Sequence, residues 1–297
     1  MKLGSNDISS VYLGTNGVSK VYLGSTEVWS AVDVFEFTIN TTNISTGSSN
    51  ADQFKLPLTT STGLDCIVDW GDGNTDNITS HTASEVTHTY TSSGVYTVKI
   101  TGDLLGWQFN SGGDRLKMLD VKKWSGLNIS LNQGFYNCTN MTCTATDAPL
   151  ITTTDLYRFF RGCSNFNGAI GNWDTSSVTN MTQMFNNATL FNQPLNWDTS
   201  SVTDMSFMLS NAILFNQDIS NWDINQVTNF SSFMSFTTGL STTNYDLLLV
   251  GWEAQAPTSG ININFGGSKY TLGSAAATAR ASLISTYGWT ITDGGGI

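Results

Sequence analysis

The amino-acid sequence predicts a mainly β fold with short helices, built from an N-terminal β-segment, a small β-sandwich, a repeat solenoid and an α/β C-terminal cap. Segments that recur every 24 or 25 residues predict the solenoid. Alternating apolar runs separated by glycine-rich turns predict the strands before it, and helical apolar spacing predicts the cap. The expected parts are residues 1–31, 32–102, 103–240 and 241–297.

The first 31 residues carry a repeat of their own. LGSNDISSVY, LGTNGVSKVY and LGSTEVW follow each other at a period of ten, and each reads as a short strand after a glycine turn. Three short strands bury little apolar surface, so we expect them to dock onto another surface or onto other copies of the chain. An ordinary β-meander lying on the next domain is the alternative. The expected attachment residues are Leu3, Val11, Leu13, Val21, Leu23 and Trp29.

The next segment alternates as half-buried strands do, at Phe35, Phe37 and Ile39 and again over 95–100. Its DWGDGNT (69–75) and THTYTSSGVYTVKITG (87–102) resemble the PKD-type Ig-like sandwich, whose hallmarks are a WGDG turn and an HxY…GxYxV strand pair. The resemblance implies an Ig-like β-sandwich that acts as a spacer or adhesion module. A packing role is expected for His88.

The second repeat set dominates the chain. WDTSSVTNMTQMFNNATLFNQPLN starts at Trp173, WDTSSVTDMSFMLSNAILFNQDISN at Trp197, and a weaker copy at Trp222. FYNCTNM and FRGCSNF are degenerate upstream copies, in which Cys138 and Cys163 stand at the alanine position of the later copies. About five coils are expected. A single coil cannot offset its own ordering entropy, so stacking on neighbours and capped ends are required.

This unit resembles the BspA-like leucine-rich repeat family in its MF..A..FNQ.L..WDTS.VT.M form. The resemblance implies a leucine-rich-repeat-like solenoid in which Met181–Ala188 is a short helical turn and Leu195–Trp197 a strand. The C-terminal segment resembles the closing module that often follows such repeats. Helical spacing predicts helices over 245–256 and 275–287, with Ser274 as N-cap and Gly288 as the stop.

Composition excludes several partners. Charged residues make up 12% of the chain and the net charge is −11, so a phosphate-neutralising basic stripe is absent from the sequence and neither nucleic acid nor an anionic membrane is an expected partner. No apolar run is long enough to span a bilayer. The start lacks the apolar stretch of a secretory signal, which favours the cytosol or release by another route, such as virus assembly and lysis.

Catalytic, metal and cofactor chemistry is not expected. The two histidines both lie in the predicted sandwich, which leaves a histidine-based triad without support. Asp69, Asp72 and Asp76 around the WGDG turn are expected to close that turn, with a calcium site as the alternative. The four cysteines lack metal spacing and are expected to be buried thiols, with a disulfide from Cys138 to Cys163 or Cys143 as the alternative.

The most repeated Trp, Asp and Asn residues are expected to fill the core and close turns, with a ligand-facing role as the alternative. Recognition is expected at positions that vary between copies and on the threonine file. The candidate ligand-binding residues are Gln183, Phe207, Pro194, Asp218, Thr179, Thr203 and Thr228.

The expected function is that of a non-enzymatic phage virion protein: a fibre, spike or decoration that displays the solenoid toward a host-surface glycan or protein. The N-terminal segment resembles the start of phage tail and fibre proteins and would contact other virion proteins. A bacterial cell-surface adhesin is the alternative, and an intracellular interaction scaffold is a third hypothesis. Homo-oligomerisation stays open, because the sequence has no coiled-coil heptads to indicate a state.

Overall fold

The computed structural model describes residues 33–60 and 62–297 in full, together with the backbone of short strands within residues 2–30. The chain divides into two compact units, Met1–Asp33 and Val34–Ile297. The structure is mainly β with two α-helices, which confirms the predicted fold class at this level.

The first unit consists of two small antiparallel sheets. One pairs β1 (Lys2–Leu3) with β2 (Asn6–Asp7), and the other is a meander of β3 (Ser10–Gly14), β4 (Gly17–Leu23) and β5 (Thr26–Ser30). The described strands therefore recur with the ten-residue repeat. The side chains of the expected attachment residues lie outside the described residues: Leu3, Val11, Leu13, Val21, Leu23 and Trp29.

The second unit begins with a six-stranded sheet in the order β14-β12-β6-β11-β8-β9. Its strands are β6 (Val34–Asn40), β8 (Asp65–Asp69), β9 (Thr75–Ile78), β11 (Val95–Asp103), β12 (Met118–Lys123) and β14 (Thr142–Cys143). A separate antiparallel pair joins β7 (Gln53–Lys55) to β10 (Thr87–Thr89), which follows the short 3-10 helix Ser84–Val86. The alternation predicted at Phe35, Phe37 and Ile39 is confirmed, because all three side chains of β6 are fully buried.

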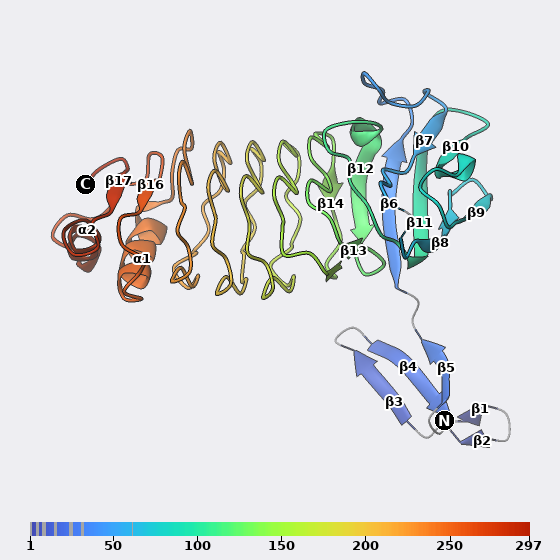
Figure 1. Ribbon diagram of the computed structural model, residues 1–297, viewed down its shortest axis with the longest axis horizontal. Helices are drawn as coiled ribbons and strands as arrows, with labels where there is room; N and C mark the ends of the chain where they lie inside the picture. The colour runs from blue at the N-terminus through green and yellow to red at the C-terminus, as the bar shows by residue number, and fades with distance from the viewer. Residues whose placement is uncertain are drawn as a thin grey trace. The chain divides into compact units, whose positions relative to one another are not determined.

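This sheet continues across the expected boundary between residues 102 and 103. β11 runs on to Asp103, and β12, which follows the 3-10 helix Arg115–Lys117, pairs antiparallel with β6. β14 then pairs in parallel with β12. The change from antiparallel to parallel pairing marks the start of the stacked coils (Figure 1), since successive turns of a coil run in the same direction.

The WGDG turn and the HxY strand meet in an aromatic cluster. The rings of Trp70 and His88 stack with centroids 4.8 Å apart, and Tyr90 packs edge-on against His88 at 4.6 Å. His88 Nε2 lies 2.8 Å from Asp72 Oδ2. Burial raises the pKa of Asp72, but hydrogen bonds from His88 and Asn74 outweigh it and hold that pKa below its ordinary value. The packing role expected for His88 is therefore confirmed.

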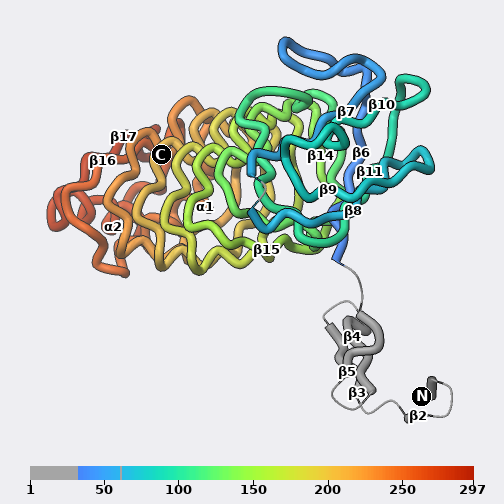
Figure 2. Tube along the Cα trace, turned by 45° about the vertical axis from the view of Figure 1, so that its right-hand side comes forward, coloured from blue at the N-terminus to red at the C-terminus, as the bar shows by residue number. Residues whose placement is uncertain are grey.

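Successive coils lie side by side in the middle of the chain (Figures 1 and 2). They stack through backbone hydrogen bonds between residues 23 to 25 apart in the sequence. The N–H groups of 181, 183, 185 and 187 donate to the carbonyls of 204, 206, 208 and 210. Parallel bridges join Asp155, Asn180, Asp204 and Asn229 in one file, and β13 (Asn128–Ile129) pairs in parallel with β15 (Leu150–Ile151). Each coil thus depends on its neighbours, as in other repeat arrays.

Tryptophans and phenylalanines fill the inside of the coils. Trp197 Nε1 donates to the Ile170 carbonyl at 2.9 Å, and Trp222 Nε1 donates to the Leu195 carbonyl at 3.0 Å. Phe191 stacks on the equivalent phenylalanines of both neighbouring coils, Phe166 at 5.9 Å and Phe215 at 6.0 Å. The core role expected for the repeated aromatic residues is therefore confirmed.

The alanine position is fully buried at Ala188 and Ala212 and at the two cysteines that replace alanine upstream. All four cysteines are free thiols. Cys163 Sγ lies 2.9 Å from the Phe135 carbonyl oxygen, to which its thiol donates, and burial raises the pKa of Cys138 well above the ordinary thiol value. These thiols act as small apolar side chains.

Two local predictions taken from the family resemblance were wrong. Residues 182–187 form consecutive turns instead of a helical turn, and Leu195–Trp197 is not a strand. The reason lies in the hydrogen bonds: the N–H groups of residues 183–187 donate alternately to the neighbouring coil and within local four-residue turns. A helix would take all of those donors for itself, and the coils would lose their main connection.

The C-terminal cap continues the coil pattern with helices. α1 (Thr242–Glu253) places Trp252 Nε1 3.1 Å from the Ile219 carbonyl, which repeats the indole contact of the coils. α2 (Ala275–Ser285) starts at the predicted N-cap, where the Ser274 hydroxyl accepts from the Ala277 N–H. β16 (Asn262–Asn264) and β17 (Thr290–Thr292) pair in parallel. Both predicted helices are therefore confirmed, although α1 begins and ends three residues earlier.

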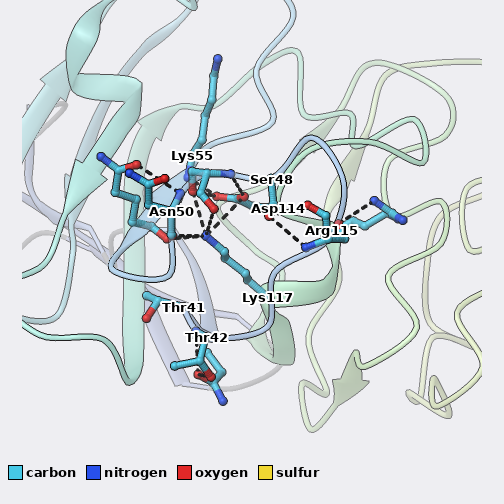
Figure 3. Close-up of polar contacts among 12 residues, drawn as sticks. Thr41, Thr42, Ser48, Asn50, Lys55, Asp114, Arg115 and Lys117 are labelled. Atoms are coloured by element: carbon cyan, nitrogen blue, oxygen red, sulfur yellow. Dashed lines mark hydrogen bonds and ion pairs between the residues drawn. The ribbon is translucent and has the colours of Figure 1, made fainter.

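A buried ion pair fastens the loop after β6 to the first coil (Figure 3). Lys117 and Asp114 have fully buried side chains, with Nζ 3.4 Å from Oδ1. Lys117 Nζ donates to the carbonyls of Ser49, Asn50 and Gln53, and Asp114 accepts from the N–H groups of Ser49 and Lys55. The pair therefore replaces water for several backbone groups at once.

Candidate functional site

The turns that replace the expected helix repeat an unusual backbone conformation. In each coil, the third residue of two successive turns has positive φ, as in a type II turn. The first file is Gln133, Arg158, Gln183, Phe207 and Ser232, and the second is Asn137, Gly162, Asn187, Asn211 and Phe236. Glycine and asparagine suit this position, but a bulky side chain there costs about 1–2 kcal/mol.

These two files converge on a surface depression of about 450 Å³, which we call the coil groove. It is lined by Arg161, Gln183, Asn186, Asn187, Phe207, Ser210, Asn211 and Phe236. Five of these eight residues occupy left-handed positions. The strained turns thus supply much of the surface of the groove, because a left-handed residue directs its side chain away from the buried face of the coil.

Exposed aromatic rings and amides make up most of this surface. Phe236 is 83% exposed and Phe207 is 37% exposed. Asn211 Nδ2 donates to Asn187 Oδ1 at 2.7 Å, and Asn187 Nδ2 donates to Asn186 Oδ1 at 2.8 Å. The amide ladder fixes the direction of donors and acceptors along the groove, while the rings offer apolar faces beside it.

Gln183 and Phe207, two of the candidate ligand-binding residues, lie together in the coil groove. Pro194 lies elsewhere, in a separate depression of about 380 Å³ with Gly171 and Asn196. Asp218 is exposed and accepts from the Ser220 N–H to close a turn. The variable positions are therefore divided between two surface depressions and, for Asp218, an exposed turn outside both.

The threonine file is a ladder between coils. The hydroxyls of Thr179, Thr203 and Thr228 donate to the carbonyls of Thr154, Thr179 and Thr203, at 3.2, 3.1 and 3.3 Å. Each hydroxyl proton is thereby used inside the stack. These residues connect the coils. A ligand could only donate a hydrogen bond to each hydroxyl oxygen, because its proton is already donated within the stack.

The repeated aspartates close turns, as expected from their register. Asp174 Oδ1 accepts from the Ser176 hydroxyl at 2.7 Å, and Asp198 Oδ1 accepts from the Ser200 hydroxyl at 2.6 Å. These hydrogen bonds hold the pKa of both carboxyl groups below the ordinary value. Asp72 and Asp76 likewise accept from Asn74 and Trp70 within the WGDG turn.

The remaining groove residues, Arg161, Asn187, Asn211 and Phe236, were not predicted from the sequence. Asn187 and Asn211 follow Gln183 and Phe207 by four residues. The sequence therefore contained a second repeated position that could have indicated these asparagines. Phe236 lies in the degenerate third copy. Only the structure shows that these positions form one surface, because amino-acid type alone does not indicate the positive φ of Phe236 or the place of Arg161 beside the next coil.

Two further features bear on chemistry. Within the described ranges, no three His, Cys, Asp or Glu side chains come together as a metal site would require. No helix of this part of the chain is both long enough and apolar enough to cross a bilayer.

The fold and the groove together define a class: a mainly β protein of stacked coils that carries a polar and aromatic surface depression. Residues 129–248 match a family described as "Mycoplasma protein of unknown function, DUF285". The matched segment covers most of the coils and enters α1, and the match is compatible with BspA-like repeat proteins. No curated protein and no solved structure matches the chain.

Proposed function

We propose that this protein is a non-enzymatic phage virion protein, a fibre, spike or decoration, whose coils form a leucine-rich-repeat-like solenoid that binds a host-surface glycan or protein. The coil groove is the observation that carries the binding role. Residues held in strained left-handed conformations persist where function requires them. Two phenylalanines occupy such positions with their rings exposed, a costly arrangement for a purely structural turn.

A glycan suits the groove better than a small apolar ligand does. Sugars present C–H faces to aromatic rings and hydroxyl groups to amides, and the groove offers Phe207 and Phe236 beside Asn187 and Asn211. Residues of several successive coils line the depression, so it fits an extended chain of sugar rings. The residues 32–102, as a PKD-type Ig-like sandwich, would hold the stack away from its point of attachment.

Replacing Phe236 with asparagine tests the binding role. Asparagine tolerates positive φ, so the variant is expected to fold at least as stably as the wild type. Loss of the exposed ring is expected to weaken glycan binding by at least about tenfold, equivalent to about 1.4 kcal/mol. Glycan-array binding with titration calorimetry of the best ligand measures the affinity, and thermal unfolding measures the stability.

Leu214→Asn is the matched control, since Leu214 is 52% exposed and lies outside the coil groove. It removes an exposed apolar side chain of the same stack and is expected to leave binding unchanged. Equal effects of both substitutions on glycan affinity, or an intact affinity of Phe236→Asn, would contradict a binding role for the groove.

Attachment is assigned to the N-terminal unit, whose three-stranded meander forms a compact unit of its own. Deleting residues 1–31 is expected to abolish incorporation into particles and to leave the melting temperature of the remaining unit unchanged. Immunoblotting of purified particles measures incorporation. Particles that still contain the deleted protein would refute attachment through this unit, and so would a native chain found on cells and never in virions.

A bacterial cell-surface adhesin is the second candidate, and the family match favours it. The matched family is described as a Mycoplasma protein, and BspA-like repeats are compatible with a cell-surface location. The coil groove would have the same binding role in either setting. Fractionation of cells and particles separates the two proposals, while the Phe236→Asn experiment tests the role that they share.

A further inference from the structure

The coil stack has a very small number of cations, and they lie side by side. Between Lys123 and Lys269 the sequence contains only two basic residues, Arg158 and Arg161. Arg161 lines the coil groove, and Arg158 Nε donates to Gln183 Oε1, another groove residue, at 2.9 Å. All the positive charge of about 145 residues is therefore concentrated at one end of the coil groove.

One tyrosine ring holds both guanidinium groups. The guanidinium carbons of Arg158 and Arg161 lie 5.7 and 5.1 Å from the centroid of the Tyr136 ring. Arg161 also donates from Nη1 to the Tyr136 hydroxyl at 2.8 Å and from Nε to Asn186 Oδ1 at 3.0 Å. These contacts fix the orientation of Arg161, so little conformational entropy is lost when a ligand binds. Its Nη2 atom takes no part in them.

Every one of these contacts is made to a neutral group. Within residues 33–60 and 62–297, neither arginine forms an ion pair, although the chain carries a net charge of −11. The two positive guanidinium groups lie beside the same ring and repel each other. A bound anion would offset that repulsion. An anionic group is therefore the complement of this end of the groove.

We infer that the coil groove binds an acidic glycan, with a sugar carboxylate on Arg161 and the sugar rings against Phe207 and Phe236. The planar guanidinium matches a carboxylate through paired hydrogen bonds. The exposed rings favour a carboxylated sugar over a phosphate polymer without rings. This inference names the ligand class of the proposed binding function and rests on it.

The test uses the full chain on an array of neutral, carboxylated and phosphorylated glycans, followed by titration of the best carboxylated ligand and its methyl ester. The methyl ester keeps the sugar and removes the charge. Arg161→Gln is expected to weaken binding of the carboxylated ligand at least about tenfold and to leave the weak binding of the ester unchanged. Binding by the wild type is expected to weaken as salt is raised.

Lys269→Gln is the control, because it removes the same charge from an exposed position outside the groove. Arg161→Lys keeps the charge without the paired geometry, and an intermediate loss is expected even if the glutamine variant folds poorly. Preferred binding of neutral or phosphorylated glycans, or equal affinity of wild type and both Arg161 variants, overturns the inference while leaving glycan binding in place. Absence of binding to every glycan removes the proposed glycan function as well.

Discussion

Replacing Asp114 with alanine is expected to destabilise the second unit by about 3–5 kcal/mol, because it leaves the Lys117 ammonium buried without a counter-ion. Asp114 also accepts hydrogen bonds from the Ser49 hydroxyl at 2.6 Å and from the Ser49 and Lys55 N–H groups at 2.7 and 2.6 Å. All three donors would lose this acceptor. Denaturant unfolding measures the change in free energy.

The pH dependence of this variant provides a second readout. Burial lowers the pKa of Lys117 below its ordinary value, and Asp114 opposes that shift. Without Asp114 the folded-state pKa should fall further below the unfolded value of about 10.4, so the unfolded chain binds more protons between the two values. Stability of Asp114→Ala is therefore expected to rise with pH across that window, relative to the wild type.

Lys122→Ala is the control for Asp114→Ala, since Lys122 pairs with Asp120 at 3.7 Å and is 40% exposed. A surface pair of this kind contributes at most about 1 kcal/mol. Lys117→Met combined with Asp114→Ala completes a double-mutant cycle and is expected to recover part of the loss. A loss below about 1 kcal/mol for Asp114→Ala alone would show that the buried pair does not hold the loop.

Replacing Trp222 with alanine is expected to cost about 3–5 kcal/mol, because it empties a site that is only 2% exposed between two coils and the cap. The Leu195 carbonyl also loses the indole donor at 3.0 Å. Each coil contacts only its neighbours, so the loss should be greatest in adjacent coils. Hydrogen exchange by mass spectrometry is expected to show faster exchange in residues 195–252 and little change in β6 and β11.

Trp222→Phe separates the two contributions in this site. Phenylalanine keeps most of the apolar volume but lacks the N–H, so the expected loss is smaller, about 1–3 kcal/mol. Uniform loss of protection over the whole second unit would show that the coils unfold together with the sheet. An unchanged melting temperature for Trp222→Ala would contradict its place in the core.

Much of the fold follows from local patterns in the sequence. Alternating residues of β6, the Ser274 cap of α2 and the 25-residue spacing of Trp197 and Trp222 all lead to the observed elements. These features depend on burial and on short-range hydrogen bonds, which residue type and spacing report directly. The helical turn inferred for Met181–Ala188 failed because the competing hydrogen bonds come from another coil.

The candidate site could be predicted only in part. Gln183 and Phe207 were found because they differ at the same place in neighbouring copies. Their groove partner Arg161 reaches the groove from a neighbouring coil. Phe236 could not be found in this way either, because a left-handed backbone conformation, which phenylalanine usually avoids, places it there. No local signal in the sequence accounts for that conformation.

The sequence by itself determined that this chain is a stack of coils with buried tryptophans, preceded by strands and ended by helices. The regular spacing of apolar residues indicates directly which positions are buried. Tertiary structure alone decided that β12 and β14 join the sheet of β6, that Lys117 is buried on Asp114, and that Arg161 lines the groove. Those outcomes depend on contacts between distant residues, whose energies appear only when the coils are stacked.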